Sequence, residues 1–159
     1  MAQIRKARPE DLAEIEKIYA LARQFMASTG NPTQWGVTHP PRQMLEEDIV
    51  LGQLYVLEDS GIRAVFAYLE GEDPTYGYIE DGTWISSEPY GTIHRVASDG
   101  SGGRFSQILA YALSRSSHLR IDTHHDNKVM QHVLEKHGFH RCGIIYLEDG
   151  DPRIAYERI

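Results

Sequence analysis

The sequence predicts an α+β fold with α/β-type layers, in which helices pack on a mixed sheet. Segments with apolar residues at three- and four-residue steps are interleaved with short runs rich in Val, Ile, Tyr and Phe. In chain order these segments read β-α-α-β-β-β-α-β-α-β-β. The 159 residues are 41% hydrophobic and 25% charged, which is the composition of an ordinary globular domain. We therefore expect one domain over residues 1–159.

The first half of the chain supplies two helices and the first strands. Pro9 suits the first turn of a helix, because the N–H that it lacks would have no partner there. Gly30 and Pro32 end that helix, and Asp59-Ser60-Gly61 separates two apolar runs in the manner of a hairpin turn. The predicted elements are strands at 4–8, 54–57 and 63–69 and helices at 12–25 and 44–51.

The second half returns to alternating strands and helices after a stretch, 71–91, that has no clear periodicity. Asp126 or Asn127 can cap a helix, and Gly138 fits the left-handed residue that follows its last turn. The predicted elements are strands at 92–97, 119–123, 139–147 and 153–158, and helices at 105–113 and between Asn127 and Gly138.

Charge and cysteine content exclude several classes of protein. The chain has 16 Lys and Arg against 23 Asp and Glu, a formal net charge of −7, which argues against nucleic acid as a partner. Its only cysteine, Cys142, cannot form an internal disulfide and is expected in the core. No apolar run approaches the ~18 residues of a membrane span, and the first residues lack the apolar segment of a signal peptide. We expect a cytoplasmic protein with no membrane partner.

A glycine-rich loop joins the strand at 92–97 directly to the next helix. The loop contains Gly100, Ser101, Gly102 and Gly103, and Arg104 follows in the first helical turn. The first N–H groups of a helix have no internal partners, and glycines let the backbone approach a bound anion closely. The pattern indicates a phosphate or pyrophosphate cradle, although a flexible surface turn explains it equally well.

Two nucleotide-binding motifs can be tested against this loop. A P-loop needs Gly-Lys followed by Ser or Thr, but Arg104 and Phe105 follow Gly103, so that motif is absent. A dinucleotide fingerprint is weakened by Phe105 at its third glycine. It is supported by Asp122, which ends the next strand where a ribose-binding acid would lie. A small dinucleotide-binding protein therefore stays open as an alternative.

The segment 119–139 carries a more specific pattern, a strand followed by an Asn-led helix that ends in Glu135-Lys136-x-Gly138-Phe139. Together with the glycine loop and the opening Ile-Arg-x-Ala-x-x-x-Asp, it resembles the GCN5-related N-acetyltransferase (GNAT) family. The resemblance implies a mostly antiparallel sheet, acetyl-coenzyme A (acetyl-CoA) as co-substrate, no metal, and acetyl transfer by direct attack of a primary amine. The acceptor would be a small molecule or amino-acid-like amine, with a peptide amine also open. Family members often pair through sheet edges, which adds a homodimer to the expectations.

The chain departs from the family pattern at two places. The usual glycine positions of the loop hold Arg104 and Ser106, and the glycines fall earlier. Leu134 occupies the position where many members carry a Tyr that protonates the departing thiolate. These departures leave open a coenzyme A-binding module with weak or no catalysis.

The resemblance also implies the residues of the coenzyme site, on the kinked strand, the glycine loop and the Asn-led helix. Asn127 would bind the pantetheine arm as well as cap its helix. The expected coenzyme-binding residues are His94, Arg95, Val96, Ser101, Gly102, Gly103, Arg104, Phe105, Ser106, Asn127 and Met130.

Three residues are candidates for the catalytic base that makes the amine neutral. His94 lies on the strand, and an imidazole can exchange protons near neutral pH. Its alternative role is a hydrogen-bonded core histidine. Glu88 and Tyr90 precede the same strand and compete for the role.

Aromatic residues in the irregular segments suggest an acceptor pocket for a cationic amine, together with Glu80, Asp81 and Glu88. Their alternative role is to cover the edge of the core. These residues are Trp35, Tyr76, Tyr78 and Trp84. A metal site is disfavoured, because the clustered residues His124, His125, Asp126, His132, His137 and His140 lack a zinc-helix spacing.

Overall fold

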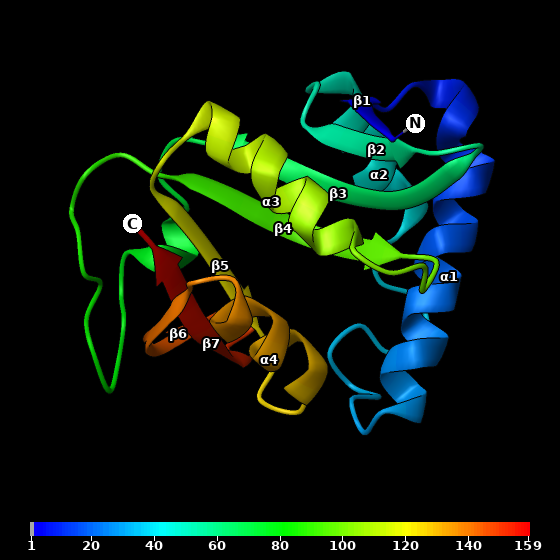
Figure 1. Ribbon diagram of the computed structural model, residues 1–159. Coiled ribbons are helices and arrows are strands. Elements are labelled where there is room, and N and C mark those ends of the chain that lie inside the picture. The colour runs from blue at the N-terminus through cyan, green and yellow to red at the C-terminus, as the bar shows by residue number, and fades with distance from the viewer. Residues whose placement is uncertain (1) are drawn as a thin grey trace.

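The computed structural model describes residues 2–159, which form a seven-stranded sheet in the order β1-β2-β3-β4-β5-β7-β6 (Figure 1). Only β4 and β5 are parallel, and every other neighbouring pair is antiparallel. The strands are β1 (Gln3–Lys6), β2 (Leu54–Glu58), β3 (Ile62–Glu70), β4 (Gly91–Ser98), β5 (Leu119–Thr123), β6 (His140–Tyr146) and β7 (Pro152–Arg158). The helices are α1 (Leu12–Ser28), α2 (Arg42–Val50), α3 (Arg104–Arg115) and α4 (Lys128–Lys136).

The order of strands and helices is the one that the sequence predicts, and the mostly antiparallel mixed sheet is confirmed. The differences lie at element ends. The helix α1 continues three residues beyond 25, to Ser28, and α2 begins at Arg42 rather than at 44. No helix among residues 2–159 is long and apolar enough to cross a membrane.

The sheet carries helices on both faces, because its central strands alternate two sets of apolar side chains. Leu54, Val56 and Val65 pack with α1, whereas Tyr55, Leu57 and Phe66 pack with α3. Leu134 of α4 joins the second cluster. The two helix layers therefore enclose β2, β3 and β4 and fix the ends of those strands in space.

An extra residue kinks β4 in its middle. The register passes from Val65 opposite Ala97 to Ala67 opposite His94, so β4 has one residue more than β3 over that step. Arg95 takes the left-handed conformation there, with φ of 52°. Its carbonyl accepts a hydrogen bond of 2.7 Å from the hydroxyl of Tyr19, and its guanidinium pairs with Asp48 at 2.9 Å. These contacts from α1 and α2 hold the bulge in one shape.

The two parallel strands separate just beyond their start. Only Gly91 with Leu119 and Thr92 with Arg120 are paired, and past these residues β4 and β5 diverge (Figure 1). Since the bulge lies on the diverging part of β4, the strands open a wedge in the sheet beside it.

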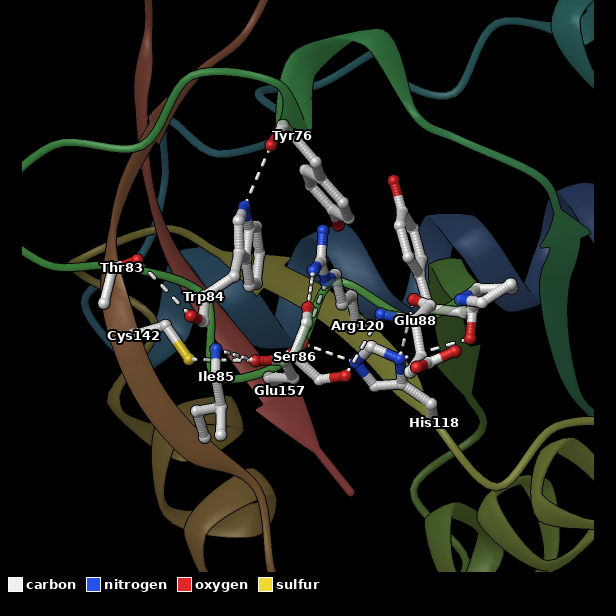
Figure 2. Close-up of polar contacts among 12 residues, drawn as sticks. Tyr76, Thr83, Trp84, Ile85, Ser86, Glu88, His118, Arg120, Cys142 and Glu157 are labelled. Atoms are coloured by element: carbon white, nitrogen blue, oxygen red, sulfur yellow. Dashed lines mark hydrogen bonds and ion pairs between the residues drawn. The ribbon is translucent and has the colours of Figure 1, made fainter.

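The long segment between β3 and β4 is fastened to the sheet by a buried carboxylate. Glu157 of β7 is completely buried and accepts hydrogen bonds from Arg120 (3.0 Å), His118 and the backbone N–H of Ile85 (2.6 Å) (Figure 2). The guanidinium of Arg120 also donates to the carbonyl of Ser86 at 2.7 Å. These hydrogen bonds hold residues 84–89 against β5 and β7.

Aromatic rings complete the same attachment. The guanidinium carbon of Arg120 lies 4.0 Å from the ring centroid of Trp84 (Figure 2). It lies 4.1 Å from the ring centroid of Tyr90. The indole N–H of Trp84 donates to the carbonyl of Tyr76 at 2.9 Å. Desolvated contacts of this kind are worth about 2 kcal/mol. These contacts hold the 3-10 turn Pro74–Tyr76 against the loop of residues 84–89.

We predict that Glu157→Gln lowers the free energy of unfolding by about 3–5 kcal/mol, because it leaves the buried Arg120 without its counter-charge. Burial opposes ionisation of Glu157, but the hydrogen bonds from His118, Ile85 and Arg120 outweigh it and lower the pKa. A lowered carboxyl pKa contributes stability above the ordinary carboxyl range, and this is lost as pH falls through the lowered value. In urea unfolding, the difference in free energy of unfolding between the wild-type protein and Glu157→Gln should therefore become smaller at acidic pH.

The matched control is Glu70→Gln, which removes an exposed carboxylate 3.8 Å from Arg115. An exposed pair contributes at most about 1 kcal/mol. Equal destabilisation by the two variants would contradict the prediction.

Candidate active site

Two cavities meet beside the bulge of β4. The first, which we call the wedge cavity, has a volume of about 580 Å³ and lies between the diverging ends of β4 and β5. The second, the helix-side cavity, has about 410 Å³ and lies between α1, the end of β4, α3 and α4. The residues that line both are Met26, Val96, Asn127 and Met130. A ligand that fills the helix-side cavity can therefore present one end to the wedge cavity.

His94 and Asp73 form a pair in the wedge cavity, with Nε2 2.9 Å from Oδ2. Burial opposes ionisation of Asp73, but hydrogen bonds from His94 and Thr75 outweigh it and lower its pKa to about 2. The backbone N–H of Asp73 donates to the hydroxyl of Tyr90 at 2.8 Å, which orients the turn. Because Asp73 is ionised, its carboxylate accepts a hydrogen bond from Nε2–H, so we assign the lone pair of the neutral ring to Nδ1.

A second carboxylate faces the wedge from β5. Asp122 accepts a hydrogen bond of 2.7 Å from the hydroxyl of Tyr76, a side chain with 2% exposure. Burial and the charge of Asp122 raise the pKa of Tyr76 well above its usual value, so the hydroxyl stays a donor. Asp122 lines the wedge cavity and not the helix-side cavity that begins at the glycine loop. It therefore does not lie where a dinucleotide interpretation requires a ribose-binding acid.

The loop between α1 and α2 covers the wedge from the other side. Trp35 lines the cavity and packs edge-on against Tyr19, with ring centroids 5.6 Å apart. The side-chain oxygen of Gln34 accepts from the amides of Asn31 (2.8 Å) and Asn127 (3.0 Å). Asn127 also caps α4, since its oxygen accepts from the N–H of Met130 at 3.0 Å. Asn127 thus links the start of α4 to the loop between α1 and α2 that covers the wedge cavity.

The helix-side cavity has mostly apolar walls. They come from α1 (Leu21, Phe25), α3 (Phe105, Ile108) and α4 (Val129, Met130, Val133). Gly100 and Arg104 lie at its end, beside the start of α3. The cavity is therefore an apolar slot that leads from the N-terminus of α3 to the bulge of β4.

The glycine loop only partly matches its predicted role. Of the predicted residues, Arg104 and Phe105 line the helix-side cavity, while Ser101, Gly102, Gly103 and Ser106 do not. The N–H of Ser101 is already bound by the carboxylate of Asp99 at 2.9 Å. Gly103 has φ of 78°, and a Cβ there would meet no atom within 4 Å. Glycine is thus favoured at position 103 by its left-handed backbone conformation and not by the close approach of another group.

Several predicted catalytic and acceptor residues lie outside both cavities, which corrects their assignment. Tyr90 and Trp84 hold Arg120, and Tyr78 is 63% exposed and stacks on Tyr146. The carboxylate of Glu88 is likewise no part of either cavity wall. The irregular segment needs these side chains for its attachment to the sheet, a demand that sequence spacing does not reveal.

Six of the predicted site residues line the wedge cavity, and their roles stay predictions. These residues are His94, Arg95, Val96, Asn127, Met130 and Trp35. Tyr76 lines neither cavity, but its hydroxyl binds Asp122, which lines the wedge cavity. Leu134 is fully buried in the core, so it offers no proton to either cavity.

Sequence reasoning missed Asp73, the partner of His94. Asp73 precedes Pro74, and its carboxylate accepts from the N–H of Thr75 at 2.9 Å. This Asx-turn pattern, Asp-Pro-Thr, could have indicated a fixed carboxylate. Its pairing with a residue on β4 depends on tertiary structure.

Cys142 lies in the core, as the sequence predicts, and three of the clustered potential metal ligands lie close together. Cys142 is buried, and burial with the nearby Glu157 raises the pKa of its thiol to about 11, which makes it a poor nucleophile. His124, His125 and Asp126 bring possible ligand atoms within 4.8 Å of one another. However, Nδ1 of His124 already accepts the backbone N–H of Asp126 at 3.0 Å.

Known proteins resemble this chain in structure. The sequence matches no family model and no curated protein. A GNAT family acetyltransferase from Streptococcus agalactiae is 32% identical, with a TM-score of 0.86 over 99% of this chain and 95% of its own. GNAT family acetyltransferases from Bacillus cereus (23% identity, TM-score 0.60, 99% and 96% covered) and Listeria monocytogenes (17%, 0.72, 99% and 94%) share the fold. With 32% identity along nearly its whole length to the first of these, the chain belongs to the GNAT family of acetyltransferases.

Proposed function

We propose that this protein transfers an acetyl group from acetyl-CoA to a primary amine of a small molecule. The observation that carries the proposal is the meeting of two cavities at the bulge of β4, where Val96, Asn127 and Met130 line both. A thioester that enters through one cavity and an amine that enters through the other would meet there. Holding two reactants in this way lowers the barrier to direct transfer.

The helix-side cavity suits the coenzyme. Its apolar walls fit the pantetheine arm, and Asn127 lies where the arm would pass. The pyrophosphate would lie at the N-terminus of α3, where unpaired N–H groups and the helix dipole favour an anion. Arg104 is held beside this point by Asp59 at 3.2 Å and adds positive charge.

The bulge of β4 suits the acetyl group. A bulge interrupts the pairing of the strand, and an N–H freed there can donate to the oxygen that becomes negative when the amine attacks. Tyr19 and Asp48 hold Arg95 from the other side, so this donor would be fixed before the reaction begins. A fixed donor loses no free energy to reorganisation during the reaction.

His94 is the proposed base. The amine nitrogen bonds to the carbonyl carbon, its proton passes to Nδ1 of His94, and the carbon–sulfur bond breaks. Asp73 holds Nε2 and stabilises the imidazolium that forms. An alkyl thiol has a pKa of about 8.5, so the coenzyme can depart as a thiolate. The reaction therefore does not require a proton donor at the position of Leu134. A coenzyme-binding module with weak catalysis is the second candidate, favoured by Leu134 itself.

We predict that Val133→Trp weakens acetyl-CoA binding at least tenfold, because the indole would fill the helix-side cavity. Calorimetric titration measures the dissociation constant. The matched control is Val50→Trp on α2, where the side chain is 85% exposed and touches neither cavity. Equal affinity in the two variants would place the coenzyme elsewhere.

We predict that His94→Gln lowers kcat about 10²-fold or more and removes the acidic limb of the pH–rate profile, with acetyl-CoA affinity unchanged. The limb arises because a protonated base cannot take a proton, so activity falls as pH falls. Asp73, with a pKa of about 2, stays ionised between pH ~5 and ~9 and contributes no limb there.

Asp73→Asn separates orientation from proton transfer. It keeps the imidazole but removes the charge that fixes Nε2–H, so we expect a lower kcat with the limb retained. A profile whose limb survives in His94→Gln would remove His94 as the base. Binding of acetyl-CoA without thiol release for any amine acceptor would favour the coenzyme-binding module.

A further inference from the structure

We propose that Gln34 is a positioning residue for acetyl transfer and acts through its hydrogen bond with Asn127. The bond joins the loop that covers the wedge cavity to a residue that lines both cavities. Acetyl-CoA that binds Asn127 in the helix-side cavity thereby also restricts the motion of Gln34 and of the loop over the acceptor site. The inference rests on the proposed acetyl transfer and adds a residue to it.

The cap of α4 fixes the orientation of the Asn127 amide. Its Oδ1 accepts the backbone N–H of Met130 at 3.0 Å, so the oxygen and not the nitrogen faces the helix. One hydrogen of Nδ2 goes to Oε1 of Gln34 at 3.0 Å. An amide nitrogen has two hydrogens, and the second has no partner among residues 2–159. It is left for a ligand in the cavities that Asn127 lines.

The same network determines the orientation of the Gln34 amide. Both neighbours of Oε1 are donors, because Nδ2 of Asn31 approaches it at 2.8 Å and Nδ2 of Asn127 at 3.0 Å. A carbonyl oxygen has two lone pairs, so these donors use both. Asn31 is 1% exposed, and its backbone N–H donates to the carbonyl of Met26 at 2.8 Å. Gln34 is therefore held between the end of α1 and the start of α4.

The neighbour of Gln34 connects the same loop to the bulge of β4. The ring of Trp35 packs against Tyr19, with centroids 5.6 Å apart, and the hydroxyl of Tyr19 donates to the carbonyl of Arg95 at 2.7 Å. The backbone carbonyl of Gln34 accepts from Arg153 of β7 at 3.4 Å. Gln34 and Trp35 both line the wedge cavity. A displacement of Gln34 would therefore move a wall of the acceptor site beside the bulge.

The loop has few backbone hydrogen bonds of its own. Residues 31–41 lie between α1 and α2 and belong to no helix or strand. Within residues 32–39 of the described chain, the only backbone N–H with a backbone partner is that of His39, which donates to the carbonyl of Trp35 at 3.2 Å. Side-chain bonds such as that of Gln34 thus restrict this segment. A first ligand that orders a segment lowers the entropy that a second ligand must lose there.

Hydrogen exchange measures this effect with acetyl-CoA as the ligand. In the wild-type protein, we expect saturating acetyl-CoA to slow exchange of the amides of residues 31–39 at least about threefold. Gln34→Met keeps the length of the side chain and removes its acceptor. We expect the slowing to fall below about 1.5-fold in this variant, with acetyl-CoA affinity within about threefold of the wild type. A purely structural role would change exchange equally with and without acetyl-CoA and leave their ratio unchanged.

Three further variants identify the bond itself. Gln34→Glu offers carboxylate oxygens to the same two donors and should keep the slowing. Asn127→Asp keeps an oxygen for the cap of α4 but removes Nδ2, so at saturating acetyl-CoA the slowing should be lost. This variant decides the question if Gln34→Met does not fold. The matched control is Gln131→Met, which removes an amide that donates to two carbonyls before α4, outside both cavities, and should keep the slowing.

The outcomes keep the two proposals apart. Equal slowing in Gln34→Met and the wild type would overturn the inference, and so would its loss in Gln131→Met. If acetyl-CoA binds the wild-type protein in calorimetry without slowing exchange in the loop, the role of Gln34 is refuted and acetyl transfer stands. Failure of the wild-type protein to bind acetyl-CoA would refute acetyl transfer itself, and the role of Gln34 with it.

Discussion

The bulge in β4 is the constraint on which the rest of the site depends. One extra residue turns Arg95 into the left-handed region, and Tyr19 from α1 and Asp48 from α2 hold its two ends. Beyond Thr92 the strand no longer pairs with β5, so the sheet opens where both helix layers still support it. A sheet that stayed paired along β4 and β5 would bury these backbone groups and leave no path between its two faces.

The long segment before β4 supplies the second condition, because it brings Asp73 and Tyr76 to the wedge. Neither residue lies on a strand or an α-helix, and a free segment of that length would lose orientation readily. Its far end is fixed by Glu157, while the hydroxyl of Tyr90 binds the N–H of Asp73. Tyr76, which the sequence suggested for substrate binding, thus contacts a carboxylate that lines the cavity, Asp122, whereas Trp35 lines the cavity itself.

The sequence predicted the fold well because local patterns determine it. The apolar stripe of α1, the hairpin at Asp59 and the Asn127 cap each identify an element without tertiary information. His94, Val96 and Asn127 were placed at the cavity through the family resemblance. Neither local patterns nor the resemblance could identify three other features, which are Asp73 as the partner of His94, the hydroxyl of Tyr19 and the amide of Gln34. Each acts on a residue distant in the chain, and only the folded sheet brings them together.

The two cavities differ in the charge of the groups at their outer ends. The helix-side cavity begins at the N-terminus of α3 beside Arg104, a setting that favours an anion. The wedge cavity ends at Asp122, Glu148 and Asp149, a setting that favours a cation. An anionic coenzyme would therefore be favoured at the start of α3 and a cationic amine in the wedge cavity, and the two would meet at the bulge. The net charge of −7 does not impede the coenzyme, because local groups at α3 rather than the whole surface set the field there.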